Sequence, residues 1–440
     1  MFETFRNAWK IEDLRKRLLF TLLIIVLFRL GCAVPVPFIA KEALTAWVGA
    51  QSDSLFGYFD MLTGGSFSRA SLFALSVTPY INASIIIQLL TVAIPALERL
   101  AKEGEDGRRR LTRITRYTGA GIATGLGIGY YILLRGQGAL LYGAGKPMFE
   151  QIFSAVVIVL AFVAGSMLIQ WLGEQIDVKG IGNGISILIF AGIVSRMSNV
   201  FSTAQSWIKL AAEGEVRYLF ALVLTPLIAI AVVVFIVVLN AAERRLPVMY
   251  AKRVVGRRMY GGQNTHIPIK VNMSGVMPVI FASALASIPG TIGGFFPNLY
   301  DPIAHPFASP FLRAFNTTGW FYAVIYLLLI IGFNYFYVGT QYNPVEIANN
   351  LRSNSGTIPG YRPGKPTSDF ITKVLGKITF IGALFLGAVA ILPIVLSAIF
   401  QIGGLSLGGT SLLIVVGVAL DTSRSLESYM LMRHHKGFLE

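Results

Sequence analysis

The stretch LTGGSFSRASLFALSVTPYINASIIIQLLTVAIP, residues 62–95, decides how the rest of the chain is interpreted. As one helix it would reach about 51 Å, well beyond a hydrocarbon core of roughly 30 Å. Two places break it. Gly64 and Gly65 lack the β-carbons that restrain the backbone, and Pro79 disfavours helical geometry just before it. The stretch therefore predicts a short helix over 66–75, followed by a membrane-spanning helix over about 77–94.

The short helix carries Arg69. An arginine that faces lipid is costly, so this segment should lie inside protein or in a water-filled cavity. One interpretation is a polar plug that leads into a pore-facing helix. The other is an amphipathic helix on the membrane surface ahead of an ordinary span. The residues alone favour neither.

The composition fixes the class of protein. Of 440 residues, 54% are hydrophobic and 13% are charged, which is typical of a polytopic membrane protein. The single cysteine, Cys32, excludes an intrachain disulfide.

Phe2, Phe5 and Trp9 recur at helical spacing among basic residues, so residues 1–17 predict an amphipathic helix on an anionic membrane face.

Ten apolar runs are long enough to span a membrane. Of the 37 Lys and Arg residues, 28 fall on the N-terminal side of these spans and 8 on the opposite side, with Arg29 inside the first span. By the positive-inside rule, both termini are cytoplasmic. The predicted spans are 18–34, 77–94, 118–134, 152–172, 181–200, 218–240, 271–292, 319–340, 374–400 and 409–430.

Ten spans divide into two sets of five, and an odd-numbered repeat inserts in opposite directions. The predicted fold is therefore an all-α polytopic membrane protein, with two inverted five-helix halves and a site between them. The expected boundaries are a segment 1–17, an N-terminal half 18–200, a C-terminal half 201–430 with cytoplasmic loops 241–270 and 343–373, and a tail 431–440.

Enzyme chemistry has no support in the sequence. The nucleotide-binding pattern GxxxxGK[ST] does not occur, and the four histidines have no metal-ligand spacing. We expect no enzyme activity, cofactor or metal. The spans also lack acidic residues at their centres, which coupled carriers usually need, although unwound backbone could supply ligands. A secondary transporter and a structural insertase scaffold without a pore remain as rivals to a channel.

Aliphatic residues recur every four positions in two spans. Val77, Ile81 and Ile85 share one face of the second span, and Ile185 and Ile189 share a face of the fifth. Such stripes usually mark helix packing. The alternative is a hydrophobic constriction, because a narrow aliphatic ring offers an ion no replacement for its hydration shell.

Two spans are only weakly apolar. The seventh carries Asn272, Ser274 and Pro278, and the second carries Asn82. These groups fit movable helices beside a cavity, or simply hydrogen bonds between helices. The basic loops 241–270 and 343–373 could attract anionic lipid, RNA phosphates or an acidic protein surface, and their length favours a partner.

Several stretches together resemble the SecY family of protein-conducting channel subunits, over nearly the whole chain. They are GGSFSRASLFAL, PYINASIIIQLLT, KEGEDGRRR, WLGEQI, GIGNGISI, YAKRVVGRR, THIPIKVNMSGVMP, NPVEIANNL, PGYRPG and GGTSLLIVV, in this order. The resemblance implies a passive channel of the bacterial plasma membrane, which passes unfolded secretory polypeptides and releases apolar segments sideways between the second and seventh spans.

The resemblance also implies site residues. A plug would cover about 63–74, including Gly64, Gly65, Ser66, Phe67, Ser68, Arg69 and Ala70. The pore ring would be Val77, Ile81, Ile185, Ile189, Ile280 and Ile414, of which Ile280 and Ile414 come only from the resemblance. The lateral gate would include Asn82, Ile85, Asn272 and Pro278. Relatives often carry isoleucine and a smaller polar residue where this chain has Val77 and Asn82.

The implied partners are the SecE and SecG subunits, the SecA motor ATPase, the ribosome, signal sequences with their polypeptides, and membrane lipid. SecE would clamp the two halves, and SecG would be peripheral. The motor or the ribosome would supply the energy and would contact Lys252, Arg253, Arg257, Arg258 and Arg362.

Overall fold

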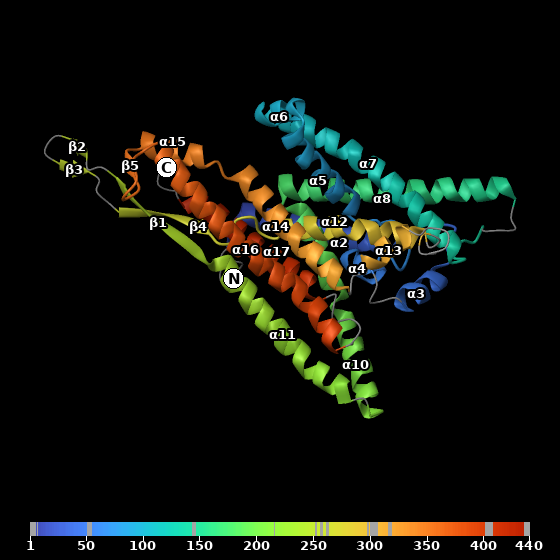
Figure 1. The fold of residues 1–440 in the computed structure, drawn as a ribbon. Coiled ribbons are helices and arrows are strands. Elements are labelled where there is room, and N and C mark those ends of the chain that lie inside the picture. The colour runs from blue at the N-terminus through green and yellow to red at the C-terminus, as the bar shows by residue number, and fades with distance from the viewer. Residues whose placement is uncertain are drawn as a thin grey trace.

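Long helices run side by side through the computed structural model, and strands project from one end (Figure 1). The structure describes residues 6, 8–50, 55–142, 147–214, 216–250, 253–255, 258–260, 264–296, 299, 307–315, 319–400 and 408–434. The first helices are α2 (Glu12–Ala33), α3 (Lys41–Ala50), α4 (Leu55–Leu62), α5 (Thr78–Ala93), α6 (Pro95–Lys102), α7 (Glu105–Gly136), α8 (Met148–Lys179), α9 (Gly184–Arg196) and α10 (Ser198–Ala212).

The second part of the chain begins with α11 (Val216–Ala241) and then forms four strands: β1 (Glu243–Tyr250), β2 (Arg253–Val255), β3 (Arg258–Tyr260) and β4 (Asn264–Lys270). The remaining elements are α12 (Met277–Phe295), α13 (Ala308–Ala314), α14 (Trp320–Gln341), α15 (Pro344–Ser353), β5 (Gly356–Thr357), α16 (Lys365–Phe400) and α17 (Gly408–His434).

Each of the ten predicted spans overlaps a helix, although the span 181–200 is divided between α9 and the first residues of α10. Within the described residues, five helices are long and apolar enough to cross a membrane, namely α8, α11, α12, α14 and α16. The pair α5 and α6, bent by 102°, makes a sixth if it counts as one span. The other predicted spans correspond to α2, α7, α9 and α17, which are shorter or carry more charge or glycine. The helical polytopic class is confirmed.

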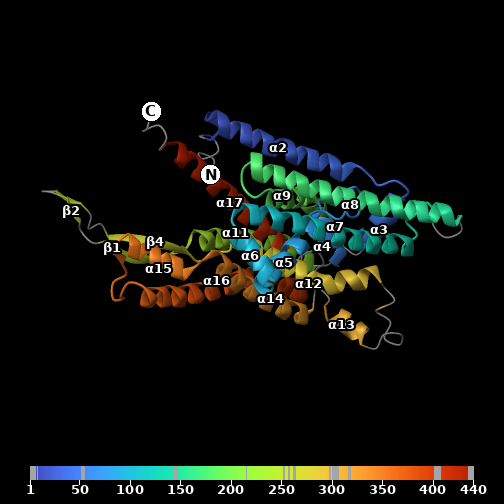
Figure 2. The ribbon, with the colours of Figure 1, turned by 90° about the horizontal axis from the view of Figure 1, so that it is seen from above.

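The start of α2 and the end of α17 both lie toward the side that carries the strands and α15 (Figure 2). Ala8, Leu14, Ile181 and Leu426 form a buried cluster there, which anchors the described part of the N-terminal segment. Phe2 and Phe5, predicted on its apolar face, lie outside the described residues.

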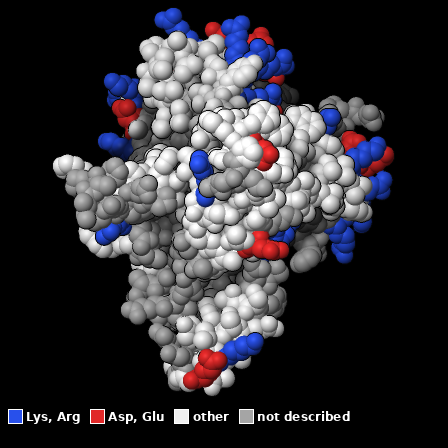
Figure 3. All heavy atoms as spheres, turned by 90° about the vertical axis from the view of Figure 1, so that its right-hand side faces the viewer, with Lys and Arg blue, Asp and Glu red and all other residues white. Residues whose placement is uncertain are grey.

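Charges are sparse on the face opposite the strands. Most of this face is uncharged, and Lys and Arg gather mainly at its upper edge, on the side of α6, and at its right-hand edge (Figure 3). The helix α7 begins at Glu105, well before the predicted span at 118, so its first turns carry arginines outside the apolar segment.

The helix α5 begins at the predicted break. Val77 is its N-cap residue, and Pro79 lies in its first turn, where the missing N–H has no helical partner to lose. The short helix predicted over 66–75 is wrong, because residues 63–77 form successive turns. Ala70 and Ser76 have positive φ angles of 46° and 50°, which no right-handed helix contains.

Long-range backbone hydrogen bonds explain this difference. The N–H of Val36 donates to the carbonyl of Ala70 at 3.1 Å, and the N–H of Leu72 donates to that of Val34 at 2.9 Å. These bonds hold the segment against the chain that follows α2, and they replace the i to i−4 bonds of a helix. Sequence periodicity carries no sign of such partners.

The seventh span also differs from its prediction. Residues 271–276 are bends and turns, and α12 starts only at Met277, with Pro278 in its first turn. Gly275, at φ 65°, supplies the left-handed residue of this entry. Pro278 therefore begins the helix instead of breaking it, while Pro289 lies inside it.

The two basic loops, 241–270 and 343–373, share one sheet with the strand order β4-β1-β5, which was not expected from the sequence. β1 and β4 are antiparallel, with Pro247 opposite His266. β5 pairs with β1 through Met249 and Thr357. The short hairpin of β2 and β3 lies at the far tip of this projection (Figure 1).

Candidate functional site

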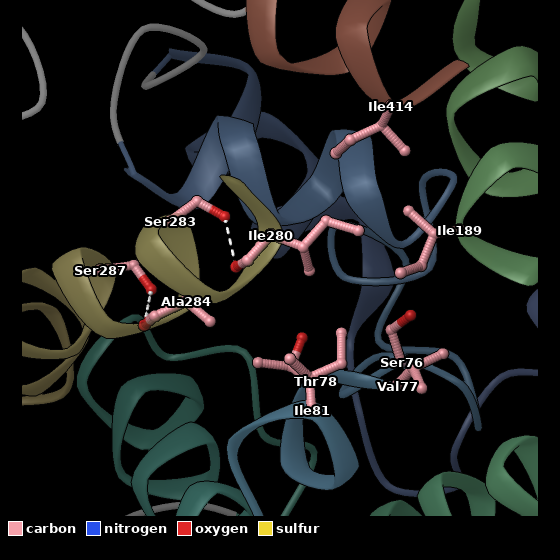
Figure 4. A pocket seen from close by; sticks show the side chains of 10 residues that line it. All are labelled: Ser76, Val77, Thr78, Ile81, Ile189, Ile280, Ser283, Ala284, Ser287 and Ile414. Carbon is pink, nitrogen blue, oxygen red and sulfur yellow. Dashed lines mark hydrogen bonds between the residues drawn. The ribbon is translucent and has the colours of Figure 1, made fainter. Parts of the chain in front are cut away.

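Five of the six predicted ring residues line a single cavity between the helices. Its volume is about 30 Å³. Figure 4 shows the aliphatic side chains pointing toward one another across it. The lining residues are Ser76, Val77, Thr78, Ile81, Ile189, Ile280, Ser283, Ala284, Ser287 and Ile414.

Four helices that are distant in the sequence supply the aliphatic side chains. Val77 and Ile81 come from the start of α5, and Ile189 comes from the middle of α9. Ile280 lies near the start of α12 and Ile414 near that of α17. Both positions known only from the resemblance therefore meet those found by spacing.

The two α12 serines in the wall have their hydroxyl groups turned back to their own helix. Ser283 donates to the carbonyl of Ile280 at 2.9 Å, and Ser287 donates to that of Ala284 at 2.8 Å (Figure 4). Because these hydroxyls are satisfied, the cavity presents mainly apolar atoms.

Ile185 is the predicted ring residue that does not line the cavity. It lies one turn before Ile189 and packs toward α8, where a Cβ built on Gly173 would be 3.2 Å from Ile185 Cγ1. The helical spacing placed it on the correct face of α9 but could not tell how far along the helix the constriction reaches.

The constriction is closed in this structure. A volume of 30 Å³ has room for one or two water molecules at most, and a polypeptide needs far more. The aliphatic walls offer no oxygen atoms to a dehydrated ion. A cavity of this size and lining has no room for a polypeptide and offers little to replace the hydration of an ion.

The predicted plug residues are buried, with the exception of Arg69, which is exposed. Phe67 packs between the rings of Phe56 and Tyr130, at centroid distances of 5.8 and 4.7 Å. The Tyr130 hydroxyl donates to the Phe67 carbonyl at 2.6 Å. The buried residues of this segment are Gly64, Gly65, Ser66, Phe67, Ser68 and Ala70.

The helices α5 and α12 are in contact, and α12 also contacts α7. Of the predicted gate residues, Ile85 and Pro278 are buried. Asn82 is half-buried, with no side-chain hydrogen bond to the described residues. Asn272 donates instead to Oδ1 of Asn240, at the end of α11, over 2.8 Å. Among the described residues, neither asparagine side chain therefore forms a hydrogen bond between α5 and α12.

The end of α12 fits tightly against the first half of the chain. A Cβ built on Gly129 of α7 would overlap the ring of Phe295, and one on Gly294 would overlap the ring of Phe56. Phe295 belongs to a buried cluster that otherwise comes from residues 36–162.

A second, more polar cavity of about 360 Å³ lies between the end of β4, the start of α12, α14 and α17. Its charged lining residues are Lys270, Asp421 and Arg424. Val276 and Met277 line this cavity, and Ile280, one helical turn later, lines the smaller aliphatic one, so the start of α12 contributes to both.

The predicted partner-binding residues are spread over the sheet and the second loop. Lys252 and Arg257 lie outside the described residues, while Arg253 and Arg258 belong to β2 and β3. Arg362 is exposed, and its carbonyl accepts a 2.8 Å hydrogen bond from Thr367 Oγ1. The rings of Tyr361 and Phe370 stack at 4.2 Å and stabilise this turn. Among the described residues, no group of His, Cys, Asp and Glu could hold a metal ion.

Residues 71–423 match the family model described as SecY. The chain is 40% identical to the protein translocase subunit SecY of Halalkalibacterium halodurans and 41% identical to that of Aquifex aeolicus, in each case over all of both chains. It also resembles a solved structure described as a protein-conducting channel, with a TM-score of 0.64 and 20% identity over 94% of this chain and 92% of the other. The chain therefore belongs to the SecY family.

Proposed function

We propose that this chain forms the conduit of a protein translocase, through which unfolded secretory polypeptides cross the bacterial plasma membrane. The observation that carries the proposal is the closed aliphatic cavity, to which four helices contribute Val77, Ile81, Ile189, Ile280 and Ile414. The full-length similarity to curated protein translocase subunits supports it.

The aliphatic ring would serve both states of the channel. In the idle state it excludes ions, because apolar side chains cannot replace water around a charge. During transport the same flexible side chains would spread around the passing chain. Ile185, one turn away on α9, would join them as the ring widens.

The contact between α5 and α12 would be the lateral gate. An apolar segment inside the conduit is more stable in lipid, by several tenths of a kcal/mol per Leu or Ile, while a charge opposes exit by about 3 kcal/mol. Asn82, Ile85, Asn272 and Pro278 lie on or beside the two helices that would separate. The plug, residues 63–74, would close the conduit beside the ring, directly before Ser76 and Val77 of the cavity wall.

The inverted halves, 18–200 and 201–430, would open as two bodies about the cavity. SecE would clamp them and SecG would lie at the periphery. The chain is a multi-pass membrane protein, and the distribution of Lys and Arg supports cytoplasmic termini, cytoplasmic loops 241–270 and 343–373, and a cytoplasmic tail 431–440.

Energy would come from partners that dock on the cytoplasmic side, because a conduit does no chemical work. One structural neighbour is a Sec61 channel in a canine ribosome complex, with a TM-score of 0.59 and 19% identity, and this neighbour supports the ribosome as a partner. SecA would be the alternative motor. Lys252, Arg253, Arg257, Arg258 and Arg362 would contact these partners, and signal sequences would enter between α5 and α12.

Crosslinking of a stalled hydrophilic secretory chain tests the proposal. Ile81→Cys and Ile280→Cys, each in a Cys32→Ser background, should give adducts with the stalled chain. Ile86→Cys on α5 and Leu285→Cys on α12 are matched controls, because these side chains are 42% and 37% exposed on the outside of the same helices. Adducts at the control positions alone would overturn the proposal.

A further inference from the structure

Asp60 is a buried carboxylate at the end of α4, directly before the proposed plug, and its side chain is 1% exposed. Its Oδ1 accepts a hydrogen bond from the backbone N–H of Ser68 at 2.7 Å. Its Oδ2 lies 2.5 Å from Nη2 of Arg196, the last residue of α9. One carboxylate thus joins the plug to a helix of the wall.

The backbone of Asp60 holds the same segment. Its carbonyl oxygen accepts from the N–H of Gly65 at 2.8 Å and from Thr63 Oγ1 at 3.1 Å. Together with the Ser68 bond, these contacts fold residues 60–68 into a compact loop. The loop turns through Gly64 and Gly65, whose φ angles are 66° and 85°.

Two arginines enclose this glycine pair. Arg29 Nη1, from α2, donates to the carbonyl of Gly64 at 3.3 Å. A Cβ built on Gly64 would lie 2.6 Å from Arg29 Nη1, and one on Gly65 would lie 3.2 Å from Arg196 Nη1. Glycine is required here both by the backbone angles and by the close approach of the two guanidinium groups.

The two members of the ion pair differ in burial, so Asp60 depends on the pair more than Arg196 does. A carboxylate removed from water is strongly unfavourable without a cation, so Asp60 depends on Arg196 while the plug is in place. Arg196 is 29% exposed and keeps contact with water. If the plug moves out, Asp60 gains its own hydration, and the pair is no longer needed.

We propose that Asp60 and Arg196 form a latch that holds the plug in its closed position. This inference rests on the proposed function, since it assigns positioning residues to the plug. The latch links the plug to the constriction, because α9 carries both Arg196 and Ile189. A polypeptide that pushes Ile189 outward also moves Arg196, and the plug is released as the ring widens.

The chain carries its own reporter for this event. Cys32, the single cysteine, is 4% exposed, and its Sγ lies 4.0 Å from the carbonyl of Thr63 at the start of the plug. A membrane-impermeant thiol reagent can reach Cys32 only when the plug leaves. Its labelling rate in the reconstituted channel complex therefore measures plug opening.

Asp60→Asn keeps an oxygen for the Ser68 N–H and removes the charge, and Arg196→Gln removes the other charge. Each variant should label at Cys32 at least tenfold faster than the parent and should raise the ion conductance of the idle channel. The double variant should resemble the single ones, because the two residues act as a pair. Arg196→Lys, which keeps the charge, should restore most of the seal.

Two further variants separate the possible outcomes. Glu174→Gln breaks the Arg116–Glu174 ion pair between α7 and α8 without touching the plug, and it should label at the parent rate. Deletion of residues 63–74 should give fast labelling and conductance. If the deletion opens the channel but Asp60→Asn and Arg196→Gln do not, the latch is wrong and the proposed function stands.

If the deletion leaves the idle channel sealed, the plug itself is misassigned, which counts against the proposed function. Effects of Asp60→Asn and Arg196→Gln that simply multiply in the double variant would also overturn the latch. Should Asp60→Asn fail to assemble with its partner subunits, the contrast between Arg196→Lys and Arg196→Gln decides alone, and equal labelling in those two variants rejects the pair.

Discussion

The hydroxyl of Tyr130 on α7 donates a 2.6 Å hydrogen bond to the backbone carbonyl of Phe67, in the middle of the proposed plug. The preceding residue of α7, Gly129, lies directly against Phe295 at the end of α12. A helix of the first half, a helix of the second half and the plug therefore meet in one buried aromatic cluster. Separation of α12 from α7 would therefore change the packing of the aromatic cluster that holds Phe67.

Replacement of Tyr130 by Phe should weaken the closed state. The substitution keeps the ring and removes one of the two donors to the buried Phe67 carbonyl, which still accepts from the N–H of Ala70 at 3.0 Å. The loss of one hydrogen bond costs about 0.5–1.5 kcal/mol, or roughly two- to tenfold in the closed-to-open ratio. Ion conductance of the idle channel and labelling of Cys32 measure the change. Tyr131→Phe, on the neighbouring residue, is the control, and an equal effect there would contradict this role of the hydroxyl.

Gly129→Ala should push the ends of α7 and α12 apart. The new methyl group would overlap the ring of Phe295, and such overpacking typically costs about 1–3 kcal/mol. Gly125→Ala lies one turn earlier on the same helix and meets no atom within 4 Å, so it should be silent. The measurement is the rate of disulfide formation between one cysteine placed on α5 and one on α12. This rate should fall in Gly129→Ala and stay at the parent value in Gly125→Ala.

A polar side chain in the ring should make the idle channel leak. Ile189→Ser removes aliphatic volume and adds a group that attracts water, so conductance should rise at least tenfold. Ile189→Leu conserves volume and should stay near the parent value. Electrical recording from reconstituted channels compares the two. Equal leakage in both variants would mean that volume and polarity at this position do not set the seal.

Arg362→Glu should impair export while leaving assembly with SecE intact. The residue is exposed on a turn stiffened by Pro359, Pro363 and the Tyr361–Phe370 stack, so reversal of its charge changes the surface and not the fold. ATP-dependent uptake of a preprotein into vesicles checks the effect. Lys209→Glu, exposed on α10, is the control. Undiminished export in Arg362→Glu would argue against a docking role.

The spans could be predicted from the sequence because each is set by local composition. Proline and glycine gave the start of α5 correctly, since their effects act within one turn. The same reasoning failed for residues 66–75, where the Val36–Ala70 and Val34–Leu72 backbone bonds override local preference. It also missed the three-stranded sheet, because β5 pairs with β1 across about a hundred residues of sequence.

Part of the site followed from spacing and part did not. Helical periodicity selected Val77, Ile81 and Ile189, which line the cavity, but also Ile185, which packs against α8. Ile280 and Ile414 have no distinguishing pattern in their own helices, so only the family resemblance brought them in. The polarity of Asn272 indicated either a movable helix beside a cavity or a hydrogen bond between helices, and only the resemblance placed it at the gate. Its partner, Asn240, could not be identified from the sequence, because the position of Asn240 depends on the packing of α11.

The strand β4 ends at Lys270 and α12 begins at Met277, so only residues 271–276 separate the sheet from the helix that carries Ile280. The same sheet holds β5, which follows directly from α15 in the other loop. A partner that binds either loop therefore acts on the same three-stranded sheet. If the ribosome and the motor both bind these loops, each would displace the start of α12 through residues 271–276. Their effects on α12 would then not be independent.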